Sequence, residues 1–564
     1  MDIRIAQFNP TVGDLKRNAA RIYDIAKKNN DADIIVFPEC ALSGYPIEDL
    51  GLNKTFQEDV TDVANKLNEM LMGLNVATVY GAPYQSHGKF YNLAFFIDVD
   101  TKEIKPFYKQ DLPNYGVFDE KRVFSNEMGY FPPLEFRGKR FAVIICEDGW
   151  NGMLNNFLKS WPFDALLWLN GSPYETFKIH QRIELARELS CLSIEEAGTK
   201  ATVVYANLVG GEDELVFDGQ SFVLHGDELT IMDGFREYTE SFIIDPGAPA
   251  DSRADAHPDI DPYLDTYKAL VLGTRDFLEK QGFKSVVLGY SGGVDSGIVA
   301  AVACDAVGPE NVHLVRLPSK FSSDHSLSDA ENGAMRLGAK LRTIDIEPVV
   351  ESLRTAYWST RAGCNHWDWE QKELEGVSDE NLQARARGTL LMAISNQEGH
   401  ILLTTGNKSE VSVGYSTLYG DMSGGFNPIK DCYKTTVWEL CRLRNSLTAR
   451  DLLEYGFLGN NEIVVPEEII VKPPSAELSE GQLDSNSLPP YPVLDSILDK
   501  IIEMKMSGDE IVEQVGYDKE TVDKVVALVY RAEYKRRQAA PGIKTTGMLH
   551  GRDRRVPIVN RWRK

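Results

Sequence analysis

The sequence has few cysteines, and none is arranged as a cross-link or a metal site. Its seven cysteines are Cys40, Cys146, Cys191, Cys304, Cys364, Cys432 and Cys441. None of them forms C-x-x-C, and no H-E-x-x-H occurs among the nine histidines. An odd, scattered set argues against a disulfide framework or a cysteine zinc site and is typical of a reducing compartment.

Long apolar runs are also missing. We find no stretch of about 18 or more apolar residues, which a transmembrane helix would need. The first residues, MDIRIAQFNP, lack the charged and apolar regions of a secretory signal peptide. The sequence therefore predicts a cytoplasmic protein with no membrane partner.

Positive charge is in short supply. The formal net charge is −24 over 564 residues, although the stretch 535–564 is basic. Nucleic-acid binding depends on clustered lysine and arginine, so the composition argues against a nucleic-acid partner. A local basic site on an acidic protein is still able to hold a small anionic substrate.

Apolar strand-like runs alternate with amphipathic stretches through the first half. The runs are IRIAQF, DIIVFPE, VATVYGAP, NLAFFIDV, FAVIICED, DALLWLN, ATVVYANL and SFVLHG. Helices are expected over Asp14–Asn29 and His180–Ala197. This mixture indicates a layered α/β domain over residues 1–245.

The segment 246–265 is rich in Pro, Asp and Ala and is expected to be a linker. A helix is expected next, over TYKALVLGTRDFLEKQG, followed by SVVLGY, NVHLVRLP and HILLTTG as parallel strands with intervening helices. We therefore predict a second α/β domain over 266–564, which ends in a helical region after the loop-like KPPSAELSEGQLDSNSLPPYP.

A glycine turn connects a strand-like run to a helix-like run in this second domain. It reads Ser291-Gly292-Gly293-Val294-Asp295-Ser296. Glycine lets the backbone approach a phosphate, and a helix N-terminus directs N–H groups toward it. Asp295 is suited to Mg²⁺. The turn matches neither G-x-x-x-x-G-K-[ST] nor G-x-G-x-x-G, so it predicts a phosphate loop of another type.

SGGVDS resembles the pyrophosphate loop of the ATP pyrophosphatases, which cleave ATP between its α- and β-phosphates. Further segments, ENLQARARG from Glu380, TTGNKSE from Thr404, GY at Gly414, YGD at Tyr419 and EYKRRQ from Glu533, resemble those of glutamine-dependent NAD synthetases. The resemblance covers most of 266–564 and implies a Rossmann-like, doubly wound parallel sheet.

The same resemblance assigns roles to individual residues. ATP would be bound by Gly289, Tyr290, Ser291, Gly292, Gly293, Val294, Asp295, Ser296, Thr405 and Lys434. Deamido-NAD would be bound by Asn381, Glu410 and Lys535, and Mg²⁺ by Asp295 and Glu410. The implied chemistry is adenylation of the nicotinate carboxylate, followed by displacement of AMP by ammonia.

A source of ammonia is expected in the first half, where three chemically suited residues follow strand-like runs. Glu39 follows DIIVFP, Lys109 begins KQDLPNYGVFDE, and Cys146 follows FAVII and precedes Glu147. In this order they resemble the Glu-Lys-Cys triad of the nitrilase superfamily's glutaminase branch, over about residues 1–245. The resemblance implies a four-layer α-β-β-α sandwich.

On this resemblance Glu39 is the general base, Cys146 the nucleophile, and Lys109 the group that favours the thiolate and stabilises the oxyanion. Tyr115, Ser172 and Lys178 would bind glutamine. The sequence departs from the family pattern at Gly171, where alanine is common, and at Phe177, where glycine is common.

Together the two halves predict a glutamine-dependent NAD synthetase that uses Mg²⁺, passes ammonia internally and forms a homo-oligomer. Three alternatives compete with this prediction: a fusion that amidates another adenylated carboxylate, a tRNA-modifying enzyme, and a non-catalytic binding or scaffold protein. ENLQARARG and EYKRRQ argue against the first, the charge of −24 and the lack of a zinc motif against the second, and the intact triad with Asp295 against the third.

Overall fold

The chain divides into two compact units in the computed structural model, an N-terminal unit (Met1–Ile260) and a C-terminal unit (Asp261–Lys564). The structure describes residues 1–126, 129–150, 152–192, 200–246, 260–359, 374–459, 462–475 and 477–562. Within these ranges, no helix combines the length and the apolar character that crossing a membrane requires.

Two six-stranded mixed sheets form the centre of the N-terminal unit. The first has the order β14-β1-β2-β3-β4-β5 and the second the order β13-β12-β9-β8-β7-β6. The first comprises β1 (Asp2–Gln7), β2 (Ile34–Val36), β3 (Ala77–Ser86), β4 (Lys89–Asp98), β5 (Glu103–Tyr108) and β14 (Tyr238–Ile243). The second comprises β6 (Leu134–Phe136), β7 (Lys139–Ile145), β8 (Ala165–Asn170), β9 (Thr202–Asn207), β12 (Phe222–His225) and β13 (Glu228–Ile231). A separate ribbon is made by β10 (Val209–Glu212) and β11 (Leu215–Asp218).

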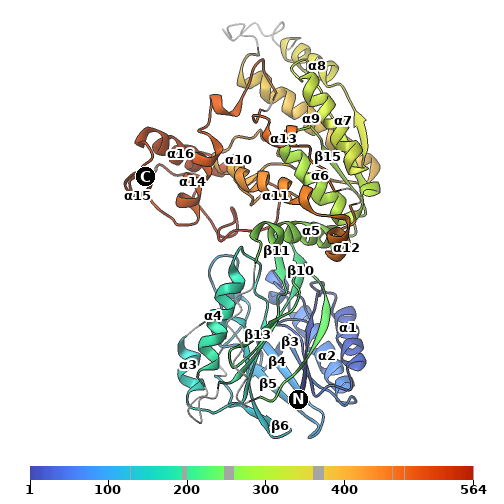
Figure 1. The fold of residues 1–564 in the computed structure, drawn as a ribbon, viewed down its shortest axis with the longest axis vertical. Coiled ribbons are helices and arrows are strands. Elements are labelled where there is room, and N and C mark those ends of the chain that lie inside the picture. Colours follow the sequence, from blue (N-terminus) through green and yellow to red (C-terminus); the bar gives the residue numbers. More distant parts are fainter. Residues whose placement is uncertain are drawn as a thin grey trace. The chain divides into compact units, whose positions relative to one another are not determined.

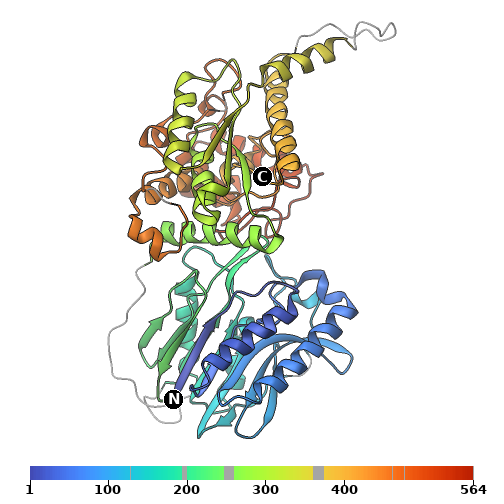
Figure 2. The ribbon, with the colours of Figure 1, turned by 90° about the vertical axis from the view of Figure 1, so that its right-hand side faces the viewer.

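Each of these sheets is covered by helices on its outer face (Figures 1 and 2). The first sheet is covered by α1 (Leu15–Lys28) and α2 (Lys54–Leu71), and the second by α3 (Gly152–Leu158) and α4 (Lys178–Ser190). Strand β8 has a continuously apolar sequence, and the packing of its side chains explains why. Leu167 belongs to the core between the sheets, while Trp168 packs toward the helices. Both faces of the strand are buried, so both need apolar side chains.

The predicted four-layer α-β-β-α sandwich is confirmed. All eight strand-like runs of the first half form strands. The helix expected over His180–Ala197 instead runs from Lys178 to Ser190, and residues 193–199 lie outside the described ranges.

A four-stranded parallel sheet forms the core of the C-terminal unit, in the order β17-β16-β15-β18. Its strands are β15 (Val286–Gly289), β16 (Val312–Arg316), β17 (Lys340–Thr343) and β18 (Ile401–Leu403). The chain order reverses between β15 and β18, which makes the carboxyl ends of these strands a topological switch point, where ligands bind in open α/β sheets. The predicted doubly wound parallel sheet is confirmed.

Helices lie on both faces of this sheet (Figure 1). The helices between residues 262 and 471 are α5 (Pro262–Gln281), α6 (Val294–Val307), α7 (Asp324–Leu337), α8 (Glu347–Ser359), α9 (Val377–Glu398), α10 (Lys408–Val413), α11 (Lys434–Ser446), α12 (Ala449–Glu454) and α13 (Glu467–Val471). Since α5 begins at Pro262, the last four residues of the expected linker 246–265 are helical; residues 247–259 lie outside the described ranges.

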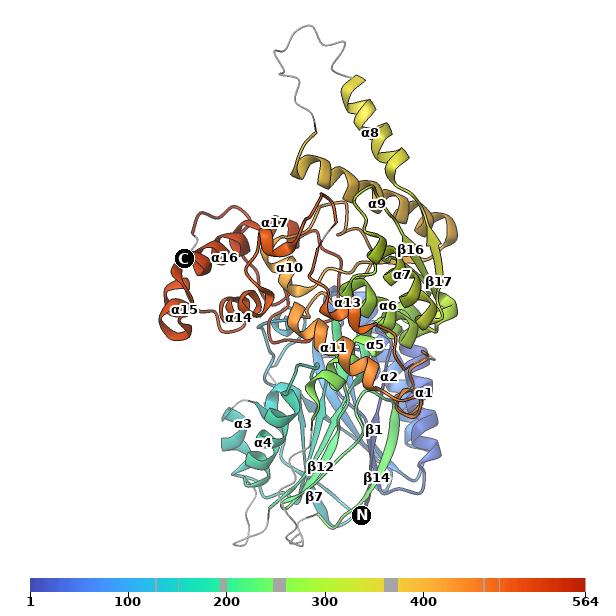
Figure 3. The same cartoon turned by 45° about the horizontal axis from the view of Figure 1, so that its top comes forward.

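The predicted final helical region consists of α14 (Tyr491–Ile502), α15 (Gly508–Val515), α16 (Lys519–Arg531) and α17 (Glu533–Arg536). These helices gather around α10 in Figure 3 and have an apolar core of their own.

Candidate active sites

The first cluster of candidate residues lies at the carboxyl ends of three strands of the N-terminal unit. Glu39 follows β2, Lys109 follows β5, and Cys146 follows β7 as the first residue of a single 3-10 turn, η3 (Cys146–Gly149). The backbone N–H of Lys109 donates to the carbonyl of Asn92 at 2.9 Å, which extends the β4–β5 pairing up to the lysine.

Lys109 lies between two carboxylates in a fully buried environment. Its Nζ is 2.7 Å from Glu39 Oε1 and 2.8 Å from Glu120 Oε1, and the side chains of Lys109 and Glu39 are both 0% exposed. Glu39 also accepts hydrogen bonds from Asn92 Nδ2 and from the N–H of Gly171, each at 2.8 Å. Both carboxylate oxygens of Glu39 therefore have fixed partners.

Burial and charge together set the protonation of this cluster. Burial alone would lower the pKa of Lys109, but Glu120 and Glu39 outweigh it and raise that pKa, so the ammonium form is favoured. Burial raises the pKa of Glu120 to about 7, although Lys109 opposes the rise. The pKa of the Cys146 thiol is raised by burial and by Glu39, and Lys109 only partly compensates. The charge of Lys109 thus acts toward the thiolate, while burial and Glu39 act more strongly toward the thiol.

The three residues predicted to bind glutamine have different surroundings. Tyr115 donates its hydroxyl to Glu147 Oε2 at 2.9 Å. Ser172 is buried, and its N–H donates to Asn207 Oδ1 at 2.9 Å. Lys178 lies at the start of α4 and contributes to the electrostatic field at Glu147. Lys178 Nζ itself lies 3.6 Å from Glu175 Oε2 and 5.2 Å from the centre of the Trp150 ring. Of these two described residues, only Tyr115 is hydrogen-bonded to Glu147, which directly follows Cys146.

The two departures from the family pattern have local consequences. A Cβ atom at Gly171 would lie 3.1 Å from Glu39 Oε2 and 3.3 Å from Leu208, so a larger residue would press on the carboxylate. Phe177 has φ 67°, in the left-handed region that favours glycine.

The second cluster lines a cavity of about 340 Å³ in the C-terminal unit, at the carboxyl ends of β15 and β18. The predicted ATP residues on its wall are Gly289, Tyr290, Ser291, Gly293, Val294, Asp295, Ser296, Thr405 and Lys434. Gly292 has φ 81°, and a Cβ there would lie 2.7 Å from the carbonyl oxygen of Ser326, so the turn requires glycine. Helix α6 begins at Val294, which directs its first N–H groups toward the turn.

Lys434 lies between Asp295 and Glu410 on this wall. It forms an ion pair with Asp295 and lies 3.6 Å from Glu410 Oε1. Asn407 donates to Asp295 Oδ1 at 2.9 Å and caps α10 together with Glu410. Burial and the charge of Asp295 raise the pKa of Glu410 to about 8, against the opposing effect of Lys434.

Asn381 and Lys535 are not part of the cavity lining but bind the segment behind it. Asn381 Oδ1 accepts from the hydroxyl of Thr417 at 2.7 Å. Lys535 Nζ donates to the carbonyls of Gly414 and Ser416 at 2.8 and 2.6 Å. Thr417 itself lines the cavity, so Asn381 contacts a residue of its wall, and the binding of deamido-NAD by Asn381 and Lys535 stays a prediction.

Comparison with known proteins matches both units. The family model described as carbon-nitrogen hydrolase matches residues 2–243, and the model described as NAD synthase matches residues 266–539. A glutamine-dependent NAD(+) synthetase from Acinetobacter baylyi is 40% identical, and the match covers 100% of this chain and 98% of the relative. The corresponding relative from Rhodobacter capsulatus is 42% identical with the same coverage.

The chain belongs to the glutamine-dependent NAD(+) synthetase family.

Solved structures of family members share the architecture. The structure of glutamine-dependent NAD+ synthetase from Acinetobacter baumannii, in complex with ADP, is 37% identical, with a TM-score of 0.72 and coverage of 99% of this chain and 98% of that one. A family member from Cytophaga hutchinsonii, 21% identical with a TM-score of 0.78 over 99% and 98% of the two chains, supports the fold alone.

Sequence reasoning within this family missed residues that complete both clusters. Glu120 ends the quoted KQDLPNYGVFDE segment, and its acidic side chain eleven positions after Lys109 was an available signal. Asn92 is a polar residue at the start of the apolar run NLAFFIDV, which is unusual for a buried strand. Asn407 follows β18, but no property of the sequence alone distinguishes it from a simple helix cap.

Proposed function

We propose that this chain converts deamido-NAD⁺, ATP, glutamine and water into NAD⁺, AMP, pyrophosphate and glutamate. The observation that carries the proposal is the presence of two complete clusters in one chain. A buried Glu39–Lys109 pair close to Cys146 is suited to amide hydrolysis, and a cavity lined by a phosphate loop is suited to ATP. Full-length relatives named for this activity support it.

In the N-terminal unit, Glu39 takes the thiol proton as Cys146 attacks the side-chain amide carbon of glutamine. The developing oxyanion is stabilised by the Lys109 ammonium. Ammonia leaves with the proton from Glu39, and a glutamyl thioester remains on Cys146. Glu39 then deprotonates a water molecule, which attacks the thioester and releases glutamate and the thiol.

Because the free site favours the thiol, proton transfer to Glu39 accompanies attack on the substrate and does not precede it. Lys109 stays protonated, since Glu120 remains beside it while Glu39 carries the transferred proton, and the oxyanion then lies close to its charge. We assign the binding of the amino-acid end of glutamine to Tyr115, Ser172 and Lys178.

In the C-terminal unit, the nicotinate carboxylate of deamido-NAD⁺ attacks the α-phosphorus of ATP, and pyrophosphate leaves. Ammonia then attacks the acyl-adenylate carbon, and AMP departs. The turn Ser291–Ser296 and the first N–H groups of α6 hold the phosphates, while Lys434 neutralises their charge.

Asp295 and Glu410 fit a Mg²⁺ ion that arrives with ATP. Carboxylate oxygens are preferred ligands of Mg²⁺, which is usually held by one or two of them together with substrate phosphates. Within the described ranges, no group of three or more His, Cys, Asp or Glu side chains is arranged to hold a metal. When bound, the ion supplies charge neutralisation at the phosphate oxygens.

The proposal is tested by incubating the purified protein with ATP, Mg²⁺, deamido-NAD⁺ and glutamine and by quantifying the products. We expect NAD⁺, AMP and pyrophosphate in equal amounts, and glutamate at least equal to NAD⁺. Absence of NAD⁺ with both glutamine and ammonium would contradict the proposal. Light scattering of the same sample tests the expected homo-oligomer.

A further inference from the structure

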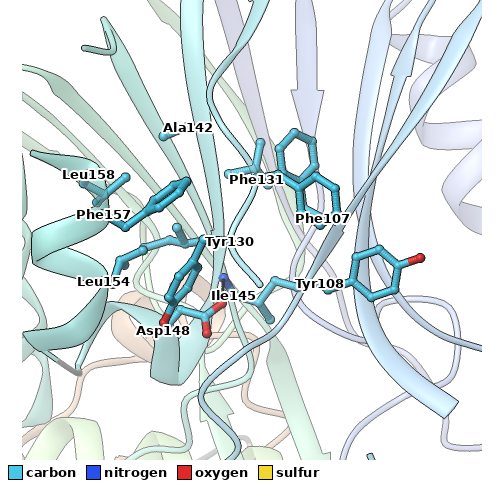
Figure 4. A pocket seen from close by; sticks show the side chains of 12 residues that line it. Phe107, Tyr108, Tyr130, Phe131, Ala142, Ile145, Asp148, Leu154, Phe157 and Leu158 are labelled. Atoms are coloured by element: carbon cyan, nitrogen blue, oxygen red, sulfur yellow. Dashed lines mark hydrogen bonds between the residues drawn. The ribbon is translucent and has the colours of Figure 1, made fainter. Parts of the chain in front are cut away.

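Asp148 is a buried carboxylate with no role in the steps above. It lies two residues after Cys146 in η3 and is 1% exposed. Figure 4 shows its side chain on the wall of a small, mostly apolar pocket, close to Tyr130 and Ile145. A carboxylate in such surroundings needs hydrogen-bond donors.

Three backbone N–H groups supply those donors. Asp148 Oδ1 accepts from the N–H of Gln110 at 2.9 Å and from that of Asp111 at 2.8 Å. Oδ2 accepts from the N–H of Ile145 at 3.1 Å. The first two donors directly follow Lys109, and the third directly precedes Cys146, so one carboxylate binds the backbone beside both residues.

The two backbone segments come from different sheets. Lys109 follows β5 of the first sheet, and Cys146 follows β7 of the second. Hydrogen bonds between strands therefore fix Lys109 within the first sheet and Cys146 within the second, but they do not fix the distance between the two residues. Asp148 accepts hydrogen bonds from the backbone beside both residues and so connects the two segments directly.

The backbone at Cys146 also needs support. Its φ is 43°, in the left-handed region where a residue with a side chain is strained. Its carbonyl accepts from Trp168 Nε1 at 3.0 Å, and the N–H one residue earlier is held by Asp148. The strained turn is thus held on both sides of the thiol.

We propose that Asp148 is a positioning residue that sets the distance between the Lys109 ammonium and the Cys146 thiol across the two sheets. The inference rests on the proposed glutaminase activity of this unit. Asp148 touches neither glutamine nor the reacting atoms and acts through the backbone of Lys109 and Cys146.

Asp148→Asn tests the connection between the two backbone segments, because it changes the hydrogen bonds of residue 148 with almost no change in side-chain volume. An asparagine has one acceptor oxygen and an NH2 group that only donates. Whichever way the amide is turned, its NH2 group faces a backbone donor, so either Ile145 or the Gln110–Asp111 pair loses its acceptor. We expect glutamate release to fall about 100-fold, because small misplacement of reacting groups has effects of that order.

Asp98→Asn is the matched control. Asp98 is also 1% exposed and accepts from the N–H groups of Asp100 and Thr101, at 3.0 and 3.1 Å, in the turn between β4 and β5. It lies at the opposite end of β5 from Lys109. Both bonds go to Oδ1, which asparagine retains, so Asp98→Asn removes a buried charge away from the site and should leave glutamate release within about twofold of the parent protein.

The pH profile of Cys146 alkylation distinguishes positioning from a general loss of stability. Iodoacetamide resembles an amide side chain, and the modified cysteine is identified by peptide mass spectrometry. Loss of the Asp148 charge by itself would lower the midpoint of alkylation, whereas movement of Lys109 away from the thiol raises it. A midpoint shifted to higher pH in Asp148→Asn therefore reports the loss of Lys109 from the thiol. The midpoint in Asp98→Asn should not move.

Equal glutamate release and equal midpoints in the two variants would overturn the inference. Hydrogen exchange on the unmodified protein tests it without a variant that must fold: the N–H groups of Gln110 and Asp111, which lie beyond β5, should be protected, and rapid exchange of both would also overturn it. If the unmodified protein releases no glutamate, the proposed function fails, while the alkylation and exchange measurements still decide the role of Asp148.

Discussion

In both units a lysine lies between two carboxylates, but the two clusters differ in their access to ligands. Lys109 contacts Glu39 and Glu120 in a site with almost no exposed surface. Lys434 contacts Asp295 and Glu410 on the wall of a cavity of about 340 Å³. Each trio carries one excess negative charge when both carboxylates are ionised.

The difference follows from what each cluster has to receive. Glutamine hydrolysis needs a base, and an excess carboxylate beside a buried thiol provides one. When Glu410 is ionised, the excess negative charge of the Lys434 cluster repels a phosphate, and a further cation that binds there reduces the repulsion and favours ATP. The same three-charge arrangement therefore predicts metal-independent glutamine hydrolysis and metal-dependent adenylation, and the following experiments test this contrast.

The largest effect is expected from Cys146→Ala. Loss of the proposed nucleophile should lower glutamine-driven NAD⁺ formation by at least about 10⁴-fold, since covalent catalysis has no substitute at this position. Synthesis from added ammonium should persist, because the second cluster is untouched. Cys191→Ala, at an exposed free cysteine, is the control and should keep both activities. Loss of ammonium-driven synthesis in folded Cys146→Ala would contradict the division of labour.

The reciprocal change is Asp295→Asn. It removes one of the two proposed magnesium ligands and the ion-pair partner of Lys434. NAD⁺ formation from either nitrogen source should fall by about 10³-fold, an effect typical of lost electrostatic stabilisation, and glutamate release should continue. Both rates are measured in the same reaction. Asp523→Asn, at an exposed position on α16, should change neither rate.

Glu410→Gln probes the charge on the open cluster through stability. The pKa of Glu410 is raised to about 8 in the folded protein, and the unfolded carboxyl titrates near its ordinary 4.5. A raised carboxyl pKa means that stability is present below pH 4.5 and is lost as pH rises toward 8. A neutral glutamine avoids this loss.

We therefore expect Glu410→Gln to match the parent protein near pH 4.5 and to exceed it by about 4 kcal/mol at pH 8, since one pKa unit corresponds to about 1.4 kcal/mol and the pKa of Glu410 is raised from 4.5 to about 8. Urea unfolding at the two pH values measures the difference. Glu513→Gln, at an exposed site, should show none. With Mg²⁺ and ATP present the difference at pH 8 should shrink, because the parent protein binds them more tightly. An unchanged difference would argue against a metal at Glu410.

The sequence predicted those parts of both sites whose residues are neighbours along the chain, namely the buried strands and the short motifs that follow them. Buried strands such as β8 are recognisable because both faces are apolar, and a motif such as SGGVDS keeps its neighbours together whatever the fold. The weakly paired outer strands β6 and β13 were not anticipated, since Leu134–Phe136 and Glu228–Ile231 are short and partly polar. These strands form through tertiary pairing more than through local preference.

Contacts between distant segments were harder to predict. Glu120 and Asn92 complete the N-terminal cluster through bonds that span 11 residues to Lys109 and 53 residues to Glu39. Asn381 and Lys535 were placed by motif, but whether such a residue contacts a ligand or supports the wall behind it depends on side-chain direction. That direction depends on contacts with segment 414–417, and the motifs give residues of this segment but not those contacts.

The smallest effect is expected at position 177, where the family pattern has glycine and this chain has phenylalanine in a left-handed backbone conformation. Phe177 precedes α4 with φ 67°, half of its side chain is exposed, and its ring lies 6.1 Å from that of His180. A left-handed conformation costs a residue with a Cβ about 1–2 kcal/mol, whereas glycine adopts it freely. Glycine also loses more backbone entropy on folding, which offsets part of this gain.

We expect Phe177→Gly to raise the free energy of unfolding of the N-terminal unit by about 1 kcal/mol. Phe177→Ala is the control: it removes the same ring but keeps the Cβ, so it should be no more stable than the parent protein. Urea unfolding of the three proteins separates the backbone effect from the ring contact. If alanine and glycine are equally stabilising, the exposed phenylalanine ring and not the left-handed backbone is the source of strain at position 177.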